Sequence, residues 1–376
     1  MKVLLAGDIC SRNRTISIIE EKLFEDALRE IPSLTSQCDY SLVNLECPVI
    51  KDNPTPISKQ GPRLYGSTKM MDAVKYMGFD GVTLANNHFY DQGEKGVRET
   101  IEALDANHVD HVGGGTNLNE ASRILYKEFE DGRLAIINCC EHEFSIATES
   151  TGGANPLNPI VQYYAVQEAK KNANYVLVIV HGGHEHYQLP SPRMVETYRF
   201  FIDAGADAVV NHHQHCYSGY EQYKDKPIFY GLGNFFFDQG KSEDGTPWNY
   251  GYCVQLDFTG NGVSYKLYPY EQCKKEPNIR LLDVNAFNDR LYELNHIISN
   301  KEKLALATQE YYKESMSSVE YFLNPYQNRI IRGLVKFGLM PSLFKEKWLL
   351  KLQNYICCEA HRDKVEYYLK NKKRLK

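Results

Sequence analysis

The fold is decided by one stretch of sequence, Ala204-Gly205-Ala206-Asp207-Ala208-Val209-Val210-Asn211-His212-His213-Gln214-His215. A short apolar run, Ala208–Val210, comes directly after a glycine and an aspartate, which is typical of a strand that begins at a turn. Imidazole and amide side chains follow this run at once. Open α/β sheets hold their functional sites beyond the carboxyl ends of their strands. The stretch therefore predicts a sheet strand with a polar site at its end.

The same rhythm extends outward through about residue 260. Short apolar or β-branched runs alternate with longer helical patterns, which predicts an α/β domain. The predicted strands are Val3–Ala6, Tyr40–Asn44, Gly81–Leu84, Leu134–Asn138, Val176–Val180, Ala208–Val210 and Ile228–Tyr230. Helical periodicity covers Glu94–Asn107 and Arg193–Ala204. A hairpin is expected from Cys253–Phe258 and Val263–Tyr268.

The composition is that of a globular protein of 376 residues, with 43% hydrophobic and 24% charged residues. A net charge of -5 lacks the basic excess of a dedicated nucleic-acid-binding protein, so no nucleic-acid partner is expected. The first apolar run ends at Asp8, too early for a signal peptide or a transmembrane segment. Ten cysteines without CxxC spacing indicate reduced thiols, and we expect a cytoplasmic protein.

Nearly every predicted strand runs directly into side chains that bind metals or transfer protons. These are Asp8, Asn44 and Glu46, Asn86 to His88 with Asp91, His181 to His186, His212 to His215, and Asn234. Taken alone, Asp8 is also consistent with a plain turn, and Asn86 to His88 with a helix-capping loop. Clusters of neutral imidazoles beside carboxylates are how proteins bind divalent metals such as zinc. The combined pattern therefore predicts a metal site.

Strand patterns stop at about residue 280, so the chain divides into a predicted α/β domain, 1–280, and a helical region, 281–376. Within the helical region, Arg329–Gln353 interleaves apolar and basic residues. Two interpretations remain open for this stretch. It forms helices that pack on the core, or it is a basic amphipathic surface for peripheral contact with a membrane or a polymer.

Several motifs also carry a family resemblance. They are Gly7-Asp8, Asn44-Leu45-Glu46-Cys47-Pro48, Asn87-His88-Phe89-Tyr90-Asp91-Gln92-Gly93, Gly113–Asn117, His181-Gly182-Gly183-His184-Glu185, Gly205 through His215, and Gly231-Leu232-Gly233-Asn234-Phe235. In this order they resemble bacterial capsule-synthesis proteins of the CapA/PgsA type, from residue 1 to about 240. The resemblance implies a calcineurin-like metallophosphoesterase fold, with two stacked sheets flanked by helices. It also implies a role in capsule or poly-γ-glutamate synthesis, beside other capsule-synthesis proteins.

The resemblance further implies roles for individual residues. The implied ligands of two divalent ions, Mn, Fe or Zn, are Asp8, Glu46 as the bridge, Asn87, His181, His213 and His215. His88 is implied as a proton donor. The chain departs from the superfamily pattern at Cys10, where His is usual, and at Glu46, where Asp is usual. Whether both ions are bound is therefore left open.

Other residues have two interpretations. Asp91 orients His88 or caps the following helix, and capping is favoured. Arg63 lies in a loop and either binds an anionic group of the substrate or is a surface arginine. Glu185 and Asn234 are further predicted substrate-binding residues.

Two functions follow from these predictions. The first is a metal-dependent hydrolase acting on a phosphoester or an amide of an anionic small molecule or polymer. The second is a metal-binding assembly component of anionic polymer synthesis without hydrolase activity. The chain has no GxxxxGK[ST] loop, so a role in synthesis would need a partner that supplies ATP. A purely structural module is disfavoured, because it would leave the histidines and carboxylates at the strand ends without a purpose.

Overall fold

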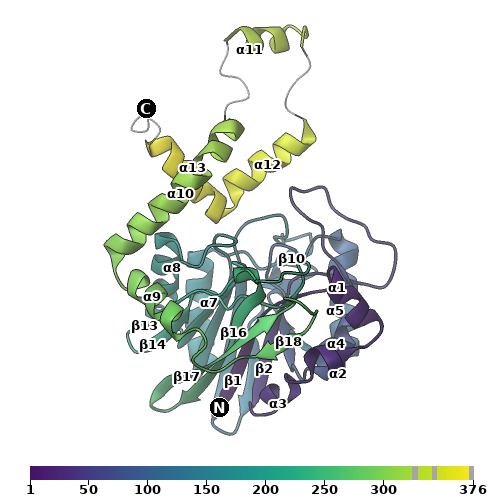
Figure 1. Cartoon of the computed structure of the whole chain (residues 1–376), viewed down its shortest axis with the longest axis vertical. Coiled ribbons are helices and arrows are strands. Elements are labelled where there is room, and N and C mark those ends of the chain that lie inside the picture. Colours follow the sequence, from purple (N-terminus) through teal and green to yellow (C-terminus); the bar gives the residue numbers. More distant parts are fainter. Residues whose placement is uncertain (324–328, 341–344, 372–376) are drawn as a thin grey trace.

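The chain forms two stacked β-sheets flanked by helices, and this computed structural model describes residues 1–323, 329–340 and 345–371 (Figure 1). The two-sheet α/β architecture expected from the sequence is thereby confirmed. Residues 324–328, 341–344 and 372–376 lie outside the described residues, and part of the predicted basic amphipathic stretch falls among them.

The larger sheet has the order β18-β17-β16-β1-β2-β5-β6, and β15 pairs with β1. Its strands are β1 (Lys2–Cys10), β2 (Tyr40–Leu45), β5 (Gly81–Thr83), β6 (Asp110–Val112), β15 (Asn234–Phe237), β16 (Tyr250–Thr259), β17 (Gly262–Gln272) and β18 (Ile279–Leu281). β1, β2, β5, β6 and β15 run parallel, whereas β16 to β18 form an antiparallel edge.

The smaller sheet has the order β13-β14-β12-β11-β9-β8. Its strands are β8 (Leu125–Phe129), β9 (Gly132–Cys140), β11 (Tyr175–His181), β12 (Ala208–His212), β13 (Tyr220–Tyr223) and β14 (Lys226–Phe229). β9, β11, β12 and β14 are parallel. Two short pairs complete the strands, β3 (Val49–Ile50) with β4 (Gly66–Ser67) and β7 (Gly114–Gly115) with β10 (Gly153–Ala154). Each strand predicted from the sequence is confirmed, as is the hairpin of β16 and β17.

Alternation along β1 shows how the layers are built. Val3 and Leu5 belong to the apolar cluster that the larger sheet shares with the smaller one, whereas Leu4 and Ala6 belong to a second cluster with the outer helices. Because successive strand residues point to opposite faces, one strand serves both clusters. An apolar strand buried on both faces is typical of parallel sheets covered by helices.

Helices cover the outer face of each sheet. The larger sheet is covered by α1 (Arg14–Glu20), α2 (Phe24–Leu28), α4 (Met70–Tyr76) and α5 (Gly93–Ala106), and the smaller one by α7 (Pro159–Asn172) and α8 (Pro192–Asp203). Three short elements, α3 (Pro32–Thr35), α6 (Leu118–Ala121) and the 3-10 helix η1 (Pro247–Asn249), lie in connections. The helices predicted over 94–107 and 193–204 correspond to α5 and α8.

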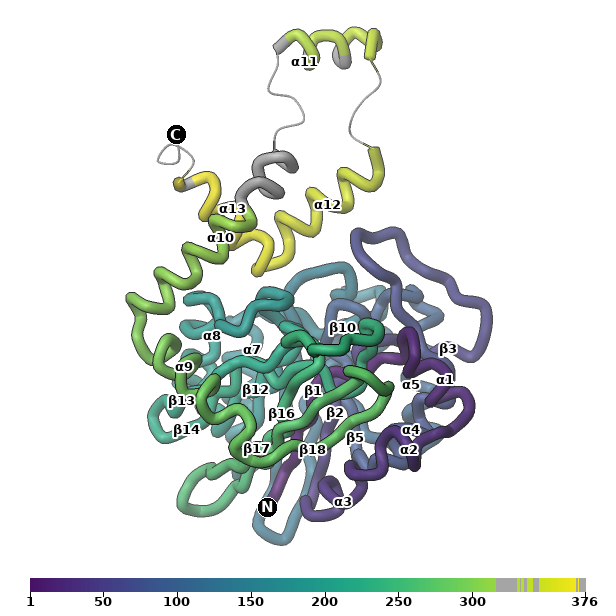
Figure 2. Tube along the Cα trace, in the orientation of Figure 1, coloured from purple at the N-terminus to yellow at the C-terminus, as the bar shows by residue number. Residues whose placement is uncertain are grey.

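The region beyond β18 is helical, with α9 (Asn288–Ile298), α10 (Lys301–Leu323), α11 (Arg329–Lys336), α12 (Glu346–Cys357) and α13 (Glu359–Asn371). Leu291, Leu294 and Ile298 of α9 join the core of the α/β part. Figures 1 and 2 show α10, α12 and α13 above the sheets, at the end opposite the N-terminus. In the described parts of the chain, no helix combines the length and the apolar character needed to cross a membrane.

Candidate metal centre

The predicted ligands converge at the carboxyl ends of the parallel strands. Because parallel strands end at the same edge of a sheet, the loops after β1, β2 and β5 meet those after β11 and β12. The converging side chains are Asp8, Glu46, Asn87, His181, His213 and His215, and all six are buried. The structure thus brings together every residue that was predicted as a ligand.

One group of three ligand atoms comes from Asp8, Glu46 and His215, which lie within 4.8 Å of one another. His215 Nε2 is 3.7 Å from Glu46 Oε1, and His215 Nδ1 is 3.8 Å from Asp8 Oδ2. A second group consists of Glu46, His181 and His213. His181 Nε2 lies 3.6 Å from Glu46 Oε1, 3.1 Å from His213 Nδ1 and 3.0 Å from Asn87 Oδ1. Glu46 is common to both groups, as a bridging ligand must be.

The surroundings of the Glu46 carboxylate indicate whether a cation fits between the two ligand groups. Glu46 is 0% exposed, and neither carboxylate oxygen has a hydrogen-bond partner among the described residues. Burial and the neighbouring charge of Asp8 raise the pKa of Glu46 well above its usual value. A buried carboxylate without partners is costly, and a divalent cation between the two groups would remove that cost. The donor set of carboxylates and imidazoles therefore fits divalent cations.

The imidazoles are held in the form that a metal requires. Burial, followed by the charge of His213, lowers the pKa of His181 well below its usual value. Burial likewise lowers the pKa of His215 to about 4. A ligating imidazole must be neutral, so both side chains are ready to bind an ion near neutral pH.

The backbone at the ligands is strained. His213 and His215 have φ angles of 93° and 57°, in the left-handed region that residues other than glycine rarely adopt. Such conformations cost about 1–3 kcal/mol each and cluster at functional sites. Gly7 in β1 and Gly233 just before β15 let the two backbones approach closely. A Cβ atom on Gly7 would overlap the carbonyl oxygen of Gly233. This approach brings β15 against β1, next to Asp8.

Residues around the ligands fix their orientation. Asn44 Nδ2 donates to Asp8 Oδ1 at 2.8 Å, and His212 Nδ1 lies 3.2 Å from the same oxygen. Although burial opposes ionisation, the hydrogen bond and charge of His212 lower the pKa of Asp8. Asn234 is fully buried, and its Oδ1 lies 2.9 Å from His215 Nδ1. Sequence reasoning did not single out His212 as a neighbour of Asp8, although it lies inside the quoted histidine motif.

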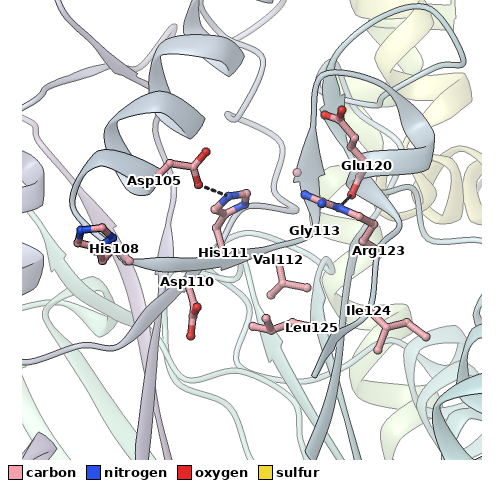
Figure 3. Close-up of a pocket in the computed structure, with 12 residues that line it drawn as sticks. Asp105, His108, Asp110, His111, Val112, Gly113, Glu120, Arg123, Ile124 and Leu125 are labelled. Atoms are coloured by element: carbon pink, nitrogen blue, oxygen red, sulfur yellow. Dashed lines mark hydrogen bonds and ion pairs between the residues drawn. The ribbon is translucent and has the colours of Figure 1, made fainter. Parts of the chain in front are cut away.

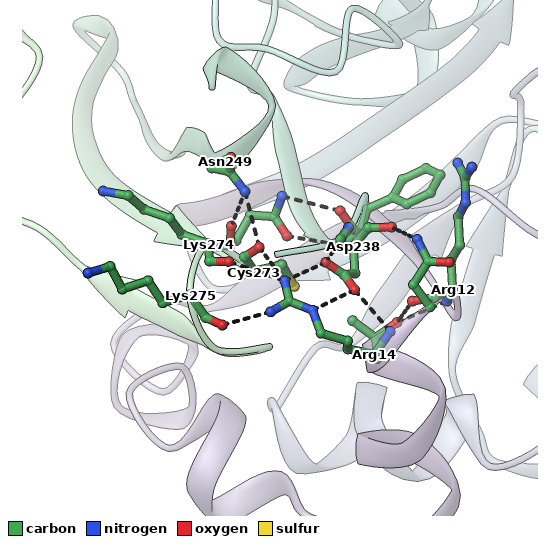
Figure 4. A network of polar contacts seen from close by, with 12 residues as sticks. Arg12, Arg14, Asp238, Asn249, Cys273, Lys274 and Lys275 are labelled. Atoms are coloured by element: carbon green, nitrogen blue, oxygen red, sulfur yellow. Dashed lines mark hydrogen bonds and ion pairs between the residues drawn. The ribbon is translucent and has the colours of Figure 1, made fainter. Parts of the chain in front are cut away.

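An ion pair joins the start of α1 to the residue that follows β15. Arg14, at the start of α1, donates from Nε to Asp238 Oδ2 at 2.9 Å and from Nη2 to Asp238 Oδ1 at 2.7 Å (Figure 4). The same guanidinium donates to the carbonyls of Cys273 and Lys275 at the end of β17. The paired geometry is the strong form of an arginine–carboxylate contact. It ties the start of α1 to the residues that directly follow β15 and β17.

His88 lies beside the ligands in a buried triad with Asp91 and Lys59. Its Nδ1 is 2.6 Å from Asp91 Oδ2, and Lys59 Nζ forms an ion pair with the other carboxylate oxygen. Asp91 also accepts from the backbone N–H of Leu64, and α5 has no side-chain cap. The helix-capping interpretation of Asp91 is therefore wrong, since both of its oxygens are used to hold His88 and the preceding loop. Sequence reasoning missed Lys59, which is 4% exposed.

The three predicted substrate-binding residues lie in different surroundings. Arg63 is exposed and donates to the carbonyls of Ile57 and Lys59 in its own loop, at 3.0 Å each. Glu185 lines a recess beside His213. Its side chain is exposed; although partial burial opposes ionisation, the charges of His215 and His213 lower the pKa of Glu185 below its usual value. Asn234 lies behind His215. The substrate-binding role of all three stays a prediction.

A comparison with known protein families covers the part of the chain that contains this centre. The family described as "Bacterial capsule synthesis protein PGA_cap" matches residues 2–239, which include every predicted ligand. The chain belongs to the PGA_cap family. The resemblance recognised in the sequence motifs is thereby confirmed.

Two relatives of this PGA_cap member come from bacilli. The chain is 33% identical over 248 residues to "Capsule biosynthesis protein CapA" of Bacillus anthracis, covering 64% of this chain and 60% of that protein. It is 30% identical over 237 residues to "PGA biosynthesis protein CapA" of Bacillus subtilis (strain 168), covering 62% of each. The match thus spans about three-fifths of the length of these relatives.

Among solved structures, a novel phosphatase from Mycoplasma pneumoniae matches 72% of this chain and 92% of its own, with 16% identity and a TM-score of 0.45. A likeness this distant does not bear on activity.

The helical wall over the centre lies outside the PGA_cap match. We use this name for α12, α13 and the part of α10 that contacts the α/β domain. His142 Nδ1 lies 2.7 Å from Glu359 Oε1, and Arg193 pairs with Asp363 at 3.0 Å. Tyr187 stacks on Tyr311 of α10 with ring centroids 4.0 Å apart. Between the wall and the centre lies a cavity of about 170 Å³.

A second cavity, of about 450 Å³, lies beside β6 (Figure 3). His111 Nε2 lies 3.2 Å from Asp105 Oδ1 in it, and none of the predicted site residues lines it. The predicted ligands of this PGA_cap member thus lie away from this cavity.

Proposed function

We propose that this chain is a metal-dependent hydrolase of the phosphoesterase type that acts on an anionic substrate in capsule or poly-γ-glutamate synthesis. Membership of the PGA_cap family supports a role in capsule or poly-γ-glutamate synthesis. The names of the relatives support it as well, because both refer to biosynthesis of capsule or PGA.

One observation carries the metal dependence. Glu46 is a fully buried carboxylate without hydrogen-bond partners, and it is shared by two groups of potential ligands. Asp8, His215 and Glu46 would hold one ion, and Glu46, His181, His213 and Asn87 the other. Bound divalent ions would polarise a phosphoryl or carbonyl group and lower the pKa of the attacking water. The donors suit Mn, Fe or Zn.

His88 is placed to donate a proton to the leaving group. Asp91 contacts Nδ1, which leaves Nε2 as the nitrogen available to the substrate. Burial and the charge of Lys59 lower the pKa of His88, whereas Asp91 favours the protonated form. Lys59 forms an ion pair with Asp91 and so offsets the negative charge of this carboxylate beside the ring. General acid catalysis of this kind contributes about 10²–10⁴-fold to turnover.

The proposal is tested by metal analysis and a substrate panel. Protein reconstituted with Mn, Fe or Zn should retain ions near stoichiometry and hydrolyse a phosphomonoester, a phosphodiester or a γ-glutamyl amide. His213→Ala should lower both readouts, whereas His296→Ala, at an exposed histidine of α9, should lower neither. Metal-free protein after reconstitution would refute the proposal. Full metal content without turnover of any panel member would instead support a metal-binding assembly role.

A further inference from the structure

A third group of potential ligands lies at the base of the helical wall. Cys358 directly precedes α13, His361 lies in its first turn, and Glu143 follows β9 in the α/β domain. One ligand atom from each lies within 4.8 Å of the others, and His361 Nδ1 is 3.9 Å from Glu143 Oε1. Zinc bonds of about 2.0–2.3 Å place tetrahedral ligand atoms about 3.3–3.8 Å apart. Small side-chain shifts would therefore close the group around an ion.

The group is distinct from the contacts that dock α13. Glu359 and Asp363 of the same helix are already paired, with His142 and Arg193. By contrast, His361 Nδ1 has no hydrogen-bond partner among the described residues, and this atom is covered although the side chain as a whole is 31% exposed. A buried nitrogen without a hydrogen-bond partner destabilises a protein by about 1–3 kcal/mol, and a bound metal ion would remove that cost.

The donor chemistry selects the class of ion. A thiolate, an imidazole and a carboxylate favour zinc and similar borderline ions over Mg²⁺ or Ca²⁺, which prefer oxygen ligands alone. Cys358 and His361 are separated by two residues, so the first turn of α13 presents both side chains to one point. Burial and the charge of Glu143 raise the pKa of the Cys358 thiol well above its usual value, so a cation bound there would have to displace the thiol proton.

The surroundings indicate what such an ion would do. The cavity of about 170 Å³ is lined by Glu143, Cys358, His361 and Lys364 on one side and by Glu185 and His213 on the other. We propose that Glu143, Cys358 and His361 bind a further divalent ion of the zinc type, which fixes α13 as the wall facing the principal cluster. This inference concerns the wall and does not depend on hydrolysis at the principal cluster.

Cobalt substitution of the full-length chain tests the proposal. Every ligand assigned to the principal cluster offers oxygen or nitrogen, so a near-ultraviolet thiolate-to-Co²⁺ charge-transfer band should report the third site alone. The band should appear in the wild-type protein and in Cys357→Ser, an exposed neighbour. It should vanish in Cys358→Ser, with loss of one ion per chain. Ser is a favourable residue at a helix N-terminal end, so this variant should fold.

Three further variants make each outcome decisive. His361→Gln should also lose one ion per chain, while His213→Ala should lose metal but keep the band. Cys10 lies in the strand that carries Asp8, so Cys10→Ser is measured as well. A band that vanishes in Cys10→Ser and persists in Cys358→Ser would place the thiolate at the principal cluster and overturn the proposal. Absence of any band in the wild-type protein would overturn it too.

Discussion

The strand-end cluster is buried and the helical wall opposite it is partly exposed, and the carboxylates of the two have different partners. In the cluster, Glu46 has no hydrogen-bond partner for either oxygen. In the wall, Glu359 and Asp363 have close partners in His142 and Arg193. A charge left unpaired in a buried site needs a cation, whereas paired charges fix a geometry. We infer that the cluster is built to receive ions and the wall to hold a position over them.

The largest effect is expected from removing the shared charge. Glu46→Gln keeps the shape of the side chain but should release both ions and abolish turnover, because Glu46 belongs to both ligand groups. Metal at about 100 times its Kd should stabilise the wild-type protein by about 2.7 kcal/mol and the variant hardly at all. Thermal unfolding with and without metal measures this difference. Glu221→Gln, at a glutamate paired with Arg199, is the matched control. Full metal content in Glu46→Gln would show that the cluster does not need this carboxylate.

A smaller and more selective effect is expected at His88. His88→Asn should lower turnover by about 10²–10⁴-fold while metal content stays near that of the wild-type protein, since the side chain is assigned as a proton donor. Asp8→Ala should lose both metal and turnover. Elemental analysis and kinetics on the best substrate of the panel separate the two variants. Equal loss of metal in both would make His88 a ligand, and unchanged turnover in His88→Asn would refute its catalytic role.

Deleting the helical wall tests whether the strand-end cluster binds its ions without it. A chain that ends at residue 300 keeps α9, whose Leu291 and Leu294 belong to the core, and keeps every principal ligand. It should retain the principal ions but show a raised KM, because Lys364 no longer lines the cavity. Metal content and the separate changes in KM and kcat measure this. Loss of the principal ions from a truncated protein that is still folded would show that the wall is part of the metal centre.

The sequence was sufficient to predict the strands and to predict that the proposed ligands come together at the strand ends, because both follow from local patterns. Apolar runs followed by Asp8, His181 or His213 are visible along the chain, and parallel strands bring such ends together. Asp91 was harder to interpret, since a carboxylate just before a helix is usually a cap. The role of Asp91 depends on a contact with a distant segment, because the backbone N–H of Leu64 donates to the Asp91 carboxylate.

Contacts between distant segments were not predictable in this way. Lys59 lies in a loop rich in Pro, Gly and Lys, a composition typical of exposed segments, yet it is buried against Asp91. Glu143 and His361 are separated by more than 200 residues, and no periodicity links them. Such pairs depend on how whole elements dock, which a local pattern does not contain.

The smallest effect is expected from replacing Arg63. The size of this effect distinguishes an arginine that stabilises its own loop from one that binds the substrate. Its guanidinium is exposed and donates to the carbonyls of Ile57 and Lys59, so it braces the loop that carries Lys59. Hydrogen bonds of this kind contribute about 0.5–1.5 kcal/mol, which corresponds to a change of about tenfold or less in kcat/KM for Arg63→Ala. Lys59→Met should cost more, because it leaves the buried Asp91 without its cation. Kinetics of both variants on one substrate make the comparison. A rise in KM well above tenfold for Arg63→Ala, with kcat unchanged, would show instead that Arg63 binds the substrate itself.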